Sequence, residues 1–177
     1  MNFSHCSLLI RLDGTLKMDK SEFYKARLSK IEIKYQTIQH QPVVTMENSH
    51  LFKGITIVKN MIIKNKKLGT YILIMSKSNT KVDFKEIAKT LHTSRSSLRF
   101  ATEAELAEDL NVVSGFVSPL IVMPNQDPSI FLIDRKLVSC SRLGFHVGRN
   151  DETVIISYGD LKKFSRYMNI ALEELAL

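Results

Sequence analysis

The sequence has little cysteine and no long hydrophobic run. Its two cysteines, Cys6 and Cys140, are too few for a disulfide framework, and no C-x-x-C or H-x-x-x-H spacing indicates a metal site. The densest apolar run, residues 71–75, is far shorter than the roughly 18 residues that a membrane span needs. Residues 7–10 are too few for the apolar region of a signal peptide. We therefore expect a reducing, cytoplasmic location, no membrane association, and neither metal nor cofactor.

The composition is that of an ordinary folded protein with an excess of positive charge. The 177 residues correspond to about one domain. Apolar residues make up 44% and charged residues 24%, which excludes a collagen-like, coiled-coil-only or wholly disordered chain. With 25 basic and 18 acidic residues the net charge is +7, which favours nucleic acid, phosphates or an acidic membrane as partner.

Patterns along the chain predict helices and strands without strict β-α-β repetition, hence a mixed α+β or α/β fold. The expected helices are 21–33, a short one after Thr45, 84–91, one opened by Thr102 and one opened by Ser157. The expected strands are 35–40, 55–63, 71–75, 98–101, 119–123, 130–134 and 153–157. We expect residues 1–17 to be a poorly ordered extension and 18–177 a single domain. A short strand at residues 7–10 is the alternative.

Between Glu47 and Asp83 the chain has no acidic residue but carries several lysines. These are Lys53, Lys59, Lys64, Lys66, Lys67, Lys77 and Lys81. Such a segment is either a solvated lysine face or a surface that follows phosphates. Lys59 stands out because the strand alternation places it where an inward-facing apolar residue is expected. A lysine there loses hydration unless it lines a cleft or snorkels from a sheet edge.

Several later segments, taken in order, are similar to the YbaK/ProX family of aminoacyl-tRNA deacylases. They are residues 99–106 (RFATEAEL), 115–119 (GFVSP), the pair Asp134-Arg135, and 144–146 (GFH) with Asn150 and Thr153. The pair Lys59-Asn60 and the opening segment 35–43 resemble the ProX branch in particular. The resemblance implies a curved mixed β-sheet flanked by helices. It also implies a free-standing trans-editing enzyme that hydrolyses the ester of mischarged tRNA, most specifically alanyl-tRNA(Pro).

The resemblance also implies a site. Lys59, Gly115 and His146 are its candidate catalytic residues, and Asn60, Ser118, Pro119 and Asn150 its candidate substrate-binding residues. Such esters are activated, so positioned water and charge stabilisation suffice, and no nucleophile motif is present. Ile57, Met61, Met75 and Phe100 are candidates for apolar lining or, equally, for the core. The implied partners are tRNA and, secondarily, prolyl-tRNA synthetase; the oligomeric state is not predicted.

Each of these residues also has a structural interpretation. Gly115 and Pro119 are common turn residues, Ser118 could cap that turn, and a lone histidine such as His146 is often structural. The chain also departs from the family pattern: Val147 follows His146, and Asp151, an acid that would repel phosphate, follows Asn150. A non-catalytic module that binds tRNA or the synthetase, and a deacylase for cysteinyl- or seryl-tRNA, are therefore the alternatives.

Overall fold

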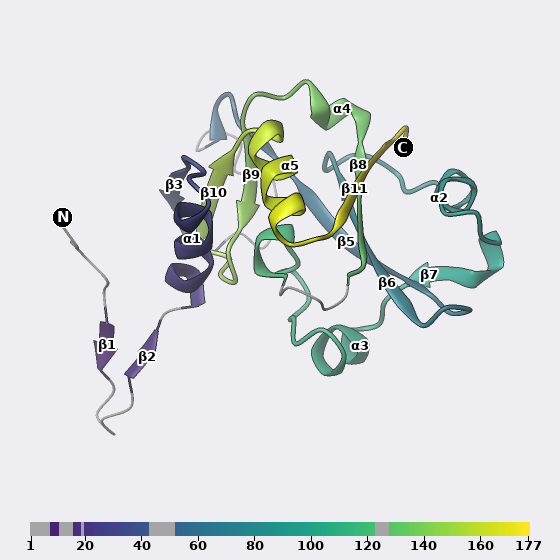
Figure 1. Ribbon diagram of the computed structural model, residues 1–177, viewed down its shortest axis with the longest axis horizontal. Helices are drawn as coiled ribbons and strands as arrows, with labels where there is room; N and C mark the ends of the chain where they lie inside the picture. The colour runs from purple at the N-terminus through teal and green to yellow at the C-terminus, as the bar shows by residue number, and fades with distance from the viewer. Residues whose placement is uncertain (1–7, 11–15, 19, 43–51, 123–127) are drawn as a thin grey trace.

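Two mixed β-sheets, each with parallel and antiparallel pairs, form the framework of the molecule (Figure 1). The computed structural model describes residues 8–10, 16–18, 20–42, 52–122 and 128–177. One sheet has the spatial order β3 (Gln36–Gln39), β10 (Glu152–Ile156), β9 (Leu143–His146) and β4 (Thr56–Ile57). The other has the order β11 (Ala171–Leu175), β8 (Ile130–Asp134), β6 (Thr70–Ser76), β5 (Lys59–Asn65) and β7 (Leu98–Phe100).

Helices flank both sheets, so the mixed fold implied by the resemblance is confirmed. They are α1 (Lys20–Lys30), α2 (Phe84–Thr90), α3 (Glu103–Glu108), α4 (Arg135–Val138) and α5 (Tyr158–Tyr167), with the 3₁₀ turns η2 (Arg95–Ser97) and η3 (Pro119–Ile121). β1 (Leu8–Ile10) and β2 (Leu16–Met18) form a separate antiparallel pair. The structure therefore contains the short strand that was the alternative prediction for residues 7–10. The rest of 1–17 lies outside the described residues, and the disordered extension stays a prediction. No helix in the described part of the chain is long and apolar enough to span a membrane.

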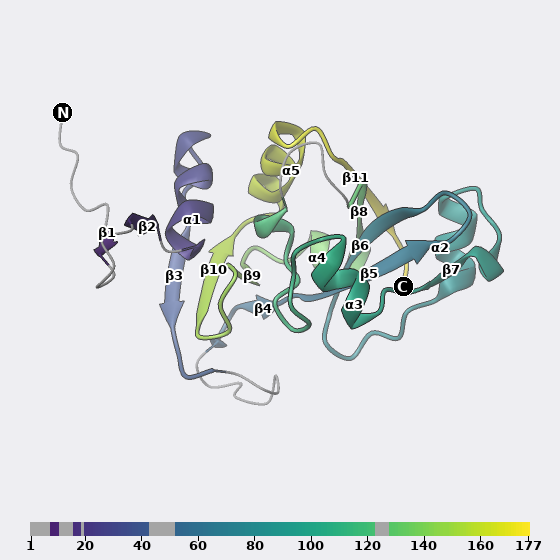
Figure 2. The ribbon, with the colours of Figure 1, turned by 90° about the horizontal axis from the view of Figure 1, so that it is seen from below.

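The main core lies between the two sheets and beneath α5, which sits between them in both views (Figures 1 and 2). Phe145 of β9, Phe131 of β8 and Phe164 of α5 are fully buried there. The five-stranded sheet is covered on both faces. Alternate residues of β6 therefore face different cores, with Leu73 in the main core and Ile72 in a second core beneath α2. This explains why β6 is a continuous apolar run.

The structure corrects three element predictions. The strand expected at 55–63 is two strands, because the chain leaves one sheet after Ile57 and enters the other at Lys59. The strand expected at 119–123 is the 3₁₀ turn η3, because Pro119 fixes φ and lacks an N–H, which suits the first turn of a helix. The helix expected at 21–33 ends at Lys30, and Glu32 has a left-handed φ of 55°. The helix after Thr45 falls outside the described residues.

Candidate functional site

A small hollow opens where the chain passes from one sheet to the other. We call it the β4–β5 hollow. Its volume is about 180 Å³, and its lining is Ile57, Val58, Lys59, Asn60, Gly115, Val117, Gly144 and His146. Three distant segments supply these residues: the β4–β5 passage, the loop after α3, and β9. In Figure 2, β4 and β5 follow one another almost end to end, with β9 and β10 beside β4.

Four of the seven predicted site residues meet in this hollow: Lys59, Asn60, Gly115 and His146. The other three do not line it. Ser118 is 1% exposed, and its hydroxyl oxygen accepts the Leu120 N–H at 3.2 Å, which caps η3. Pro119 is buried in that turn, and Asn150 lies half-buried between β9 and β10. Of the four apolar candidates only Ile57 lines the hollow, whereas Met75 is fully buried in the main core, Met61 packs against the second core and Phe100 is exposed.

Lys59 and Asn60 supply the polar groups of the β4–β5 passage. Lys59 is the first residue of β5 and is exposed at the rim, rather than buried in the middle of a strand. Its ammonium group can therefore stay hydrated until a ligand arrives. The Asn60 side chain donates through Nδ2 to the Val58 carbonyl at 3.3 Å. Its Oδ1 is buried and has no hydrogen-bond partner among the described residues.

His146 ends β9 opposite Thr153 of β10 and is half-buried. The pKa of His146 is lowered below the usual 6.5, mainly because the ring is buried. A hydrogen bond with the Gly115 backbone raises this pKa in part, and nearby His40 lowers it. The imidazole is therefore neutral at neutral pH. Because the Gly115 contact favours the protonated ring, the Gly115 carbonyl is the acceptor. The second ring nitrogen of the neutral imidazole then carries a lone pair.

His40 is a member of the site that sequence reasoning passed over. Its ring centroid lies 6.2 Å from that of His146. His40 Nδ1 lies 2.8 Å from the Gln41 carbonyl, which can only accept, so Nδ1 carries hydrogen. His40 Nε2 lies 2.9 Å from Thr153 Oγ1. The pairing of β3 with β10 brings His40 here, and the segment 35–43, already similar to the ProX branch, was the available signal.

Two glycines allow the segments to approach closely. A Cβ at Gly144 would lie 2.7 Å from Ile57 Cδ1 and 3.0 Å from Thr153 Cγ2, so no larger residue fits without displacement. Gly115 has a φ of 85°, in the left-handed region that L side chains rarely adopt. These glycines are therefore needed for the shape of the hollow.

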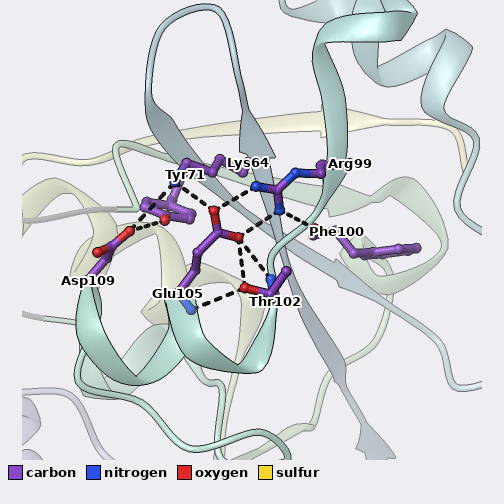
Figure 3. A network of polar contacts seen from close by, with 7 residues as sticks. All are labelled: Lys64, Tyr71, Arg99, Phe100, Thr102, Glu105 and Asp109. Carbon is purple, nitrogen blue, oxygen red and sulfur yellow. Dashed lines mark hydrogen bonds and ion pairs between the residues drawn. The ribbon is translucent and has the colours of Figure 1, made fainter.

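The loop that carries Gly115 follows α3, which a charged network fixes in place (Figure 3). The Glu105 carboxylate accepts hydrogen bonds from Arg99 at 2.7 and 2.6 Å and from Lys64 at 2.7 Å. These bonds, Arg99 first, hold the pKa of Glu105 well below its usual range. At the other end of α3, Asp109 accepts a hydrogen bond from the Tyr71 hydroxyl. The network thus determines where the loop begins.

Neither departure from the family pattern lies in the hollow. Val147 is fully buried in the main core. Asp151 accepts two hydrogen bonds from the Arg149 guanidinium at 2.8 and 2.7 Å, and this pairing lowers the pKa of Asp151. Its negative charge is therefore balanced locally. Over the described ranges, no three His, Cys, Asp or Glu side chains gather as metal ligands would.

Comparison with known proteins identifies relatives along most of the chain. The Prolyl-tRNA editing protein ProX of Acetoanaerobium sticklandii is 30% identical over 152 residues, which cover 84% of this chain and 92% of that protein. The Prolyl-tRNA synthetase associated domain-containing protein 1 of Bos taurus is 29% identical over 145 residues, which cover 78% of this chain and 84% of that one.

Solved structures share the fold at lower identity. The hypothetical protein APE2540 superposes with a TM-score of 0.70 at 18% identity, covering 88% of this chain and 98% of that one. A candidate trans-editing enzyme for prolyl tRNA synthetase superposes with a TM-score of 0.65 at 15% identity. The superposition covers 92% of this chain and 99% of that one. The model of the aminoacyl-tRNA editing domain matches residues 40–164, which include every residue of the hollow. The chain therefore belongs to the aminoacyl-tRNA editing domain family.

Proposed function

We propose that this protein is a free-standing aminoacyl-tRNA deacylase that hydrolyses alanyl-tRNA(Pro) in the cytoplasm. The observation that carries the proposal is that Lys59, Gly115 and His146 share one hollow. The similarity of the chain to a protein named for prolyl-tRNA editing supports this substrate. The net charge of +7 also favours binding of a polyanion such as tRNA. Prolyl-tRNA synthetase, the source of the mischarged tRNA, is the proposed second partner.

The residues of the hollow divide the chemistry among them. The Lys59 ammonium donates hydrogen bonds to the ester carbonyl oxygen as negative charge develops on it, and backbone N–H groups of the loop at Gly115 assist. The neutral His146 ring accepts a proton from the water that attacks the carbonyl carbon. The ester C–O bond then breaks, and the proton passes to the departing ribose oxygen. Asn60 holds the β4–β5 passage next to Lys59 through its hydrogen bond to the Val58 carbonyl.

The dimensions of the hollow favour a small amino acid. Its volume of about 180 Å³ is below the roughly 300–1,000 Å³ of pockets for drug-sized ligands. The side chains of Ile57 and Val117 provide apolar walls for a methyl group. Ser118, Pro119 and Asn150 lie outside it, so the proposal assigns them no contact with the ester and keeps them as structural supports of the loops.

A panel of charged tRNAs tests the proposal. The wild-type protein is incubated with alanyl-tRNA(Pro), alanyl-tRNA(Ala), cysteinyl-tRNA and seryl-tRNA, and release of the amino acid is followed. We expect fastest release from alanyl-tRNA(Pro). Faster release from cysteinyl- or seryl-tRNA would mean that this tRNA, and not alanyl-tRNA(Pro), is the substrate. Tight tRNA binding without release of an amino acid would identify a non-catalytic module instead.

The lowered pKa of His146 predicts how the reaction depends on pH. Because its pKa lies below 6.5, activity above background should be flat near pH 7 and fall as the ring becomes protonated at lower pH. His146→Asn should lower kcat by about 100-fold and remove this acid limb. His92→Asn, at an exposed histidine that already has a left-handed φ of 49°, is the matched control and should keep the wild-type profile. An acid limb that persists in His146→Asn would exclude His146 as the base.

A further inference from the structure

A second and larger hollow adjoins the first. We call it the Phe52–Lys77 hollow. Its volume is about 400 Å³, and its lining is Phe52, Ile55, Thr56, Ile57, Lys77, Ser78 and Asn79. Ile57 lines both hollows. A molecule whose reacting ester occupies the β4–β5 hollow therefore has its adjoining part next to this larger space.

Thr56 and Ile57 of β4 line the Phe52–Lys77 hollow at a sheet edge that pairs with no other strand in the described part of the chain. β4 is the last strand of its sheet, and the N–H groups of Thr56 and Val58 donate to the Arg142 and Gly144 carbonyls of the β9 side at 2.9 and 3.0 Å. Successive peptide groups of a strand point in opposite directions. The N–H and C=O of Ile57 therefore point away from β9, toward the open edge. An unpaired strand edge offers one donor and one acceptor to a planar ligand.

The turn at Lys77, Ser78 and Asn79, which also lines this hollow, is held in a fixed position. The Thr80 N–H donates to the Lys77 carbonyl at 3.1 Å, and the Thr80 hydroxyl donates to the fully buried Asp134 at 3.4 Å. Lys77 follows Ser76, which pairs with Lys59 across the β5–β6 ladder. The two lysines therefore stand on adjacent strands, one at each hollow, in a segment whose sequence contains no acid between Glu47 and Asp83.

Phe52 links the two hollows. Its ring meets the His40 ring edge to face at a centroid distance of 5.3 Å, and His40 in turn lies 6.2 Å from His146. The groups around this hollow are chemically complementary to a nucleotide. They are a half-buried aromatic ring, an unpaired peptide edge, a hydroxyl, an amide and an ammonium group. The ring stacks on a base, polar groups bind its edge, and the ammonium binds phosphate.

We propose that the Phe52–Lys77 hollow binds the terminal nucleotide of the tRNA, with its base against Phe52 and its phosphate at Lys77. The inference rests on the proposed function, because it places the ester of that nucleotide in the β4–β5 hollow. Neither Phe52 nor Lys77 was a candidate site residue in the sequence, where Lys77 was only one of several lysines in a basic segment.

The test measures deacylation kinetics of Phe52→Leu and Lys77→Gln with alanyl-tRNA(Pro). Leucine keeps apolar bulk against His40 but removes the stacking surface. We expect KM to rise about five-fold or more in each variant, with kcat within about two-fold of wild type. Lys77→Gln should also reduce the slope of log KM against log salt concentration by about 0.7, the value for one phosphate contact on a single strand. Lys67→Gln, at the exposed far end of the β5–β6 hairpin, is the control and should change neither quantity.

A second measurement separates this inference from the proposed function. Adenosine 5′-monophosphate is titrated into the protein, and the amide NMR signals of Ser78 and Asn79 are followed. We expect saturable shifts in wild type that need at least five-fold more ligand in Lys77→Gln. Unchanged KM in both variants, or no saturable shift, would overturn the inference while leaving the deacylase intact. If the wild type hydrolyses no charged tRNA, the proposed function fails and the titration alone decides whether the hollow binds a nucleotide.

Discussion

Replacing Lys59 with alanine should lower kcat/KM for alanyl-tRNA(Pro) by about 100-fold or more while the protein stays folded. Removal of one donor to a developing oxyanion commonly costs about 10²–10³ in rate. The side chain is exposed at the rim of the β4–β5 hollow, so its loss leaves no cavity in the core. The measurement is single-turnover release of alanine, with circular dichroism and thermal melting to verify the fold.

Matched variants separate the site from general charge. Lys67→Ala removes the same charge from the exposed far end of the β5–β6 hairpin and should keep near wild-type kcat/KM. Lys59→Arg keeps the charge but changes donor geometry and should recover only part of the activity. Equal losses in Lys59→Ala and Lys67→Ala would mean that Lys59 acts only through the overall electrostatic attraction of tRNA.

Replacing Lys25 with alanine should lower the free energy of unfolding by about 3–5 kcal/mol, because it leaves a buried carboxylate without its counter-charge. Glu152 of β10 is 2% exposed. Its carboxylate accepts hydrogen bonds from Lys25 Nζ at 2.7 Å and from the Ser21 hydroxyl, both on α1. Burial alone would lower the pKa of Lys25, but hydrogen bonds with Glu152 and Glu22 outweigh it and raise that pKa. The contribution of the Lys25 charge is therefore fully present at pH 7 and is lost as the pH rises through the raised pKa.

Urea unfolding at pH 7 measures the effect. Lys30→Ala, at an exposed lysine on the same helix, is the control and should change stability by no more than about 0.5 kcal/mol. Lys25→Met combined with Glu152→Gln removes both charges and should cost less than the sum of the two single changes. A loss in Lys25→Ala no greater than that in Lys30→Ala would contradict a buried ion pair that holds α1 against the sheet.

Local signals in the sequence predicted the elements that depend on neighbours along the chain. Thr102 and Ser157 each open a helix as predicted, and each forms a capping box, with Glu105 and Asp160 as the reciprocal partners. The strands expected at 55–63 and 71–75 include the antiparallel pair β5–β6. These features depend on residues that lie close together along the chain, so a single sequence contains the information.

The sequence did not predict the elements that depend on partners far away along the chain. β11 has the sequence ALEEL, which has no strand alternation, and it is a strand because it pairs in parallel with β8. The break at Val58 follows from the assignment of β4 and β5 to different sheets, which the uninterrupted apolar pattern does not reveal. His40 joins the site only through the pairing of β3 with β10.

For the same reason, the sequence indicates only part of the grouping of residues in the β4–β5 hollow. Lys59, Asn60, Gly115 and His146 lie where the resemblance implied a pocket, but their meeting depends on three separate segments. Ser118 and Pro119 belong to the same sequence motif as Gly115, yet they turn into η3 and support the loop from behind. The motif therefore indicates the loop but does not distinguish which of its residues line the hollow.

The most direct test of the central claim compares wild type and Lys59→Ala side by side in single-turnover reactions with alanyl-tRNA(Pro). We expect rapid release of alanine by the wild type and release near the spontaneous rate by the folded variant. Equal rates in the two proteins, or no release by either, would contradict it.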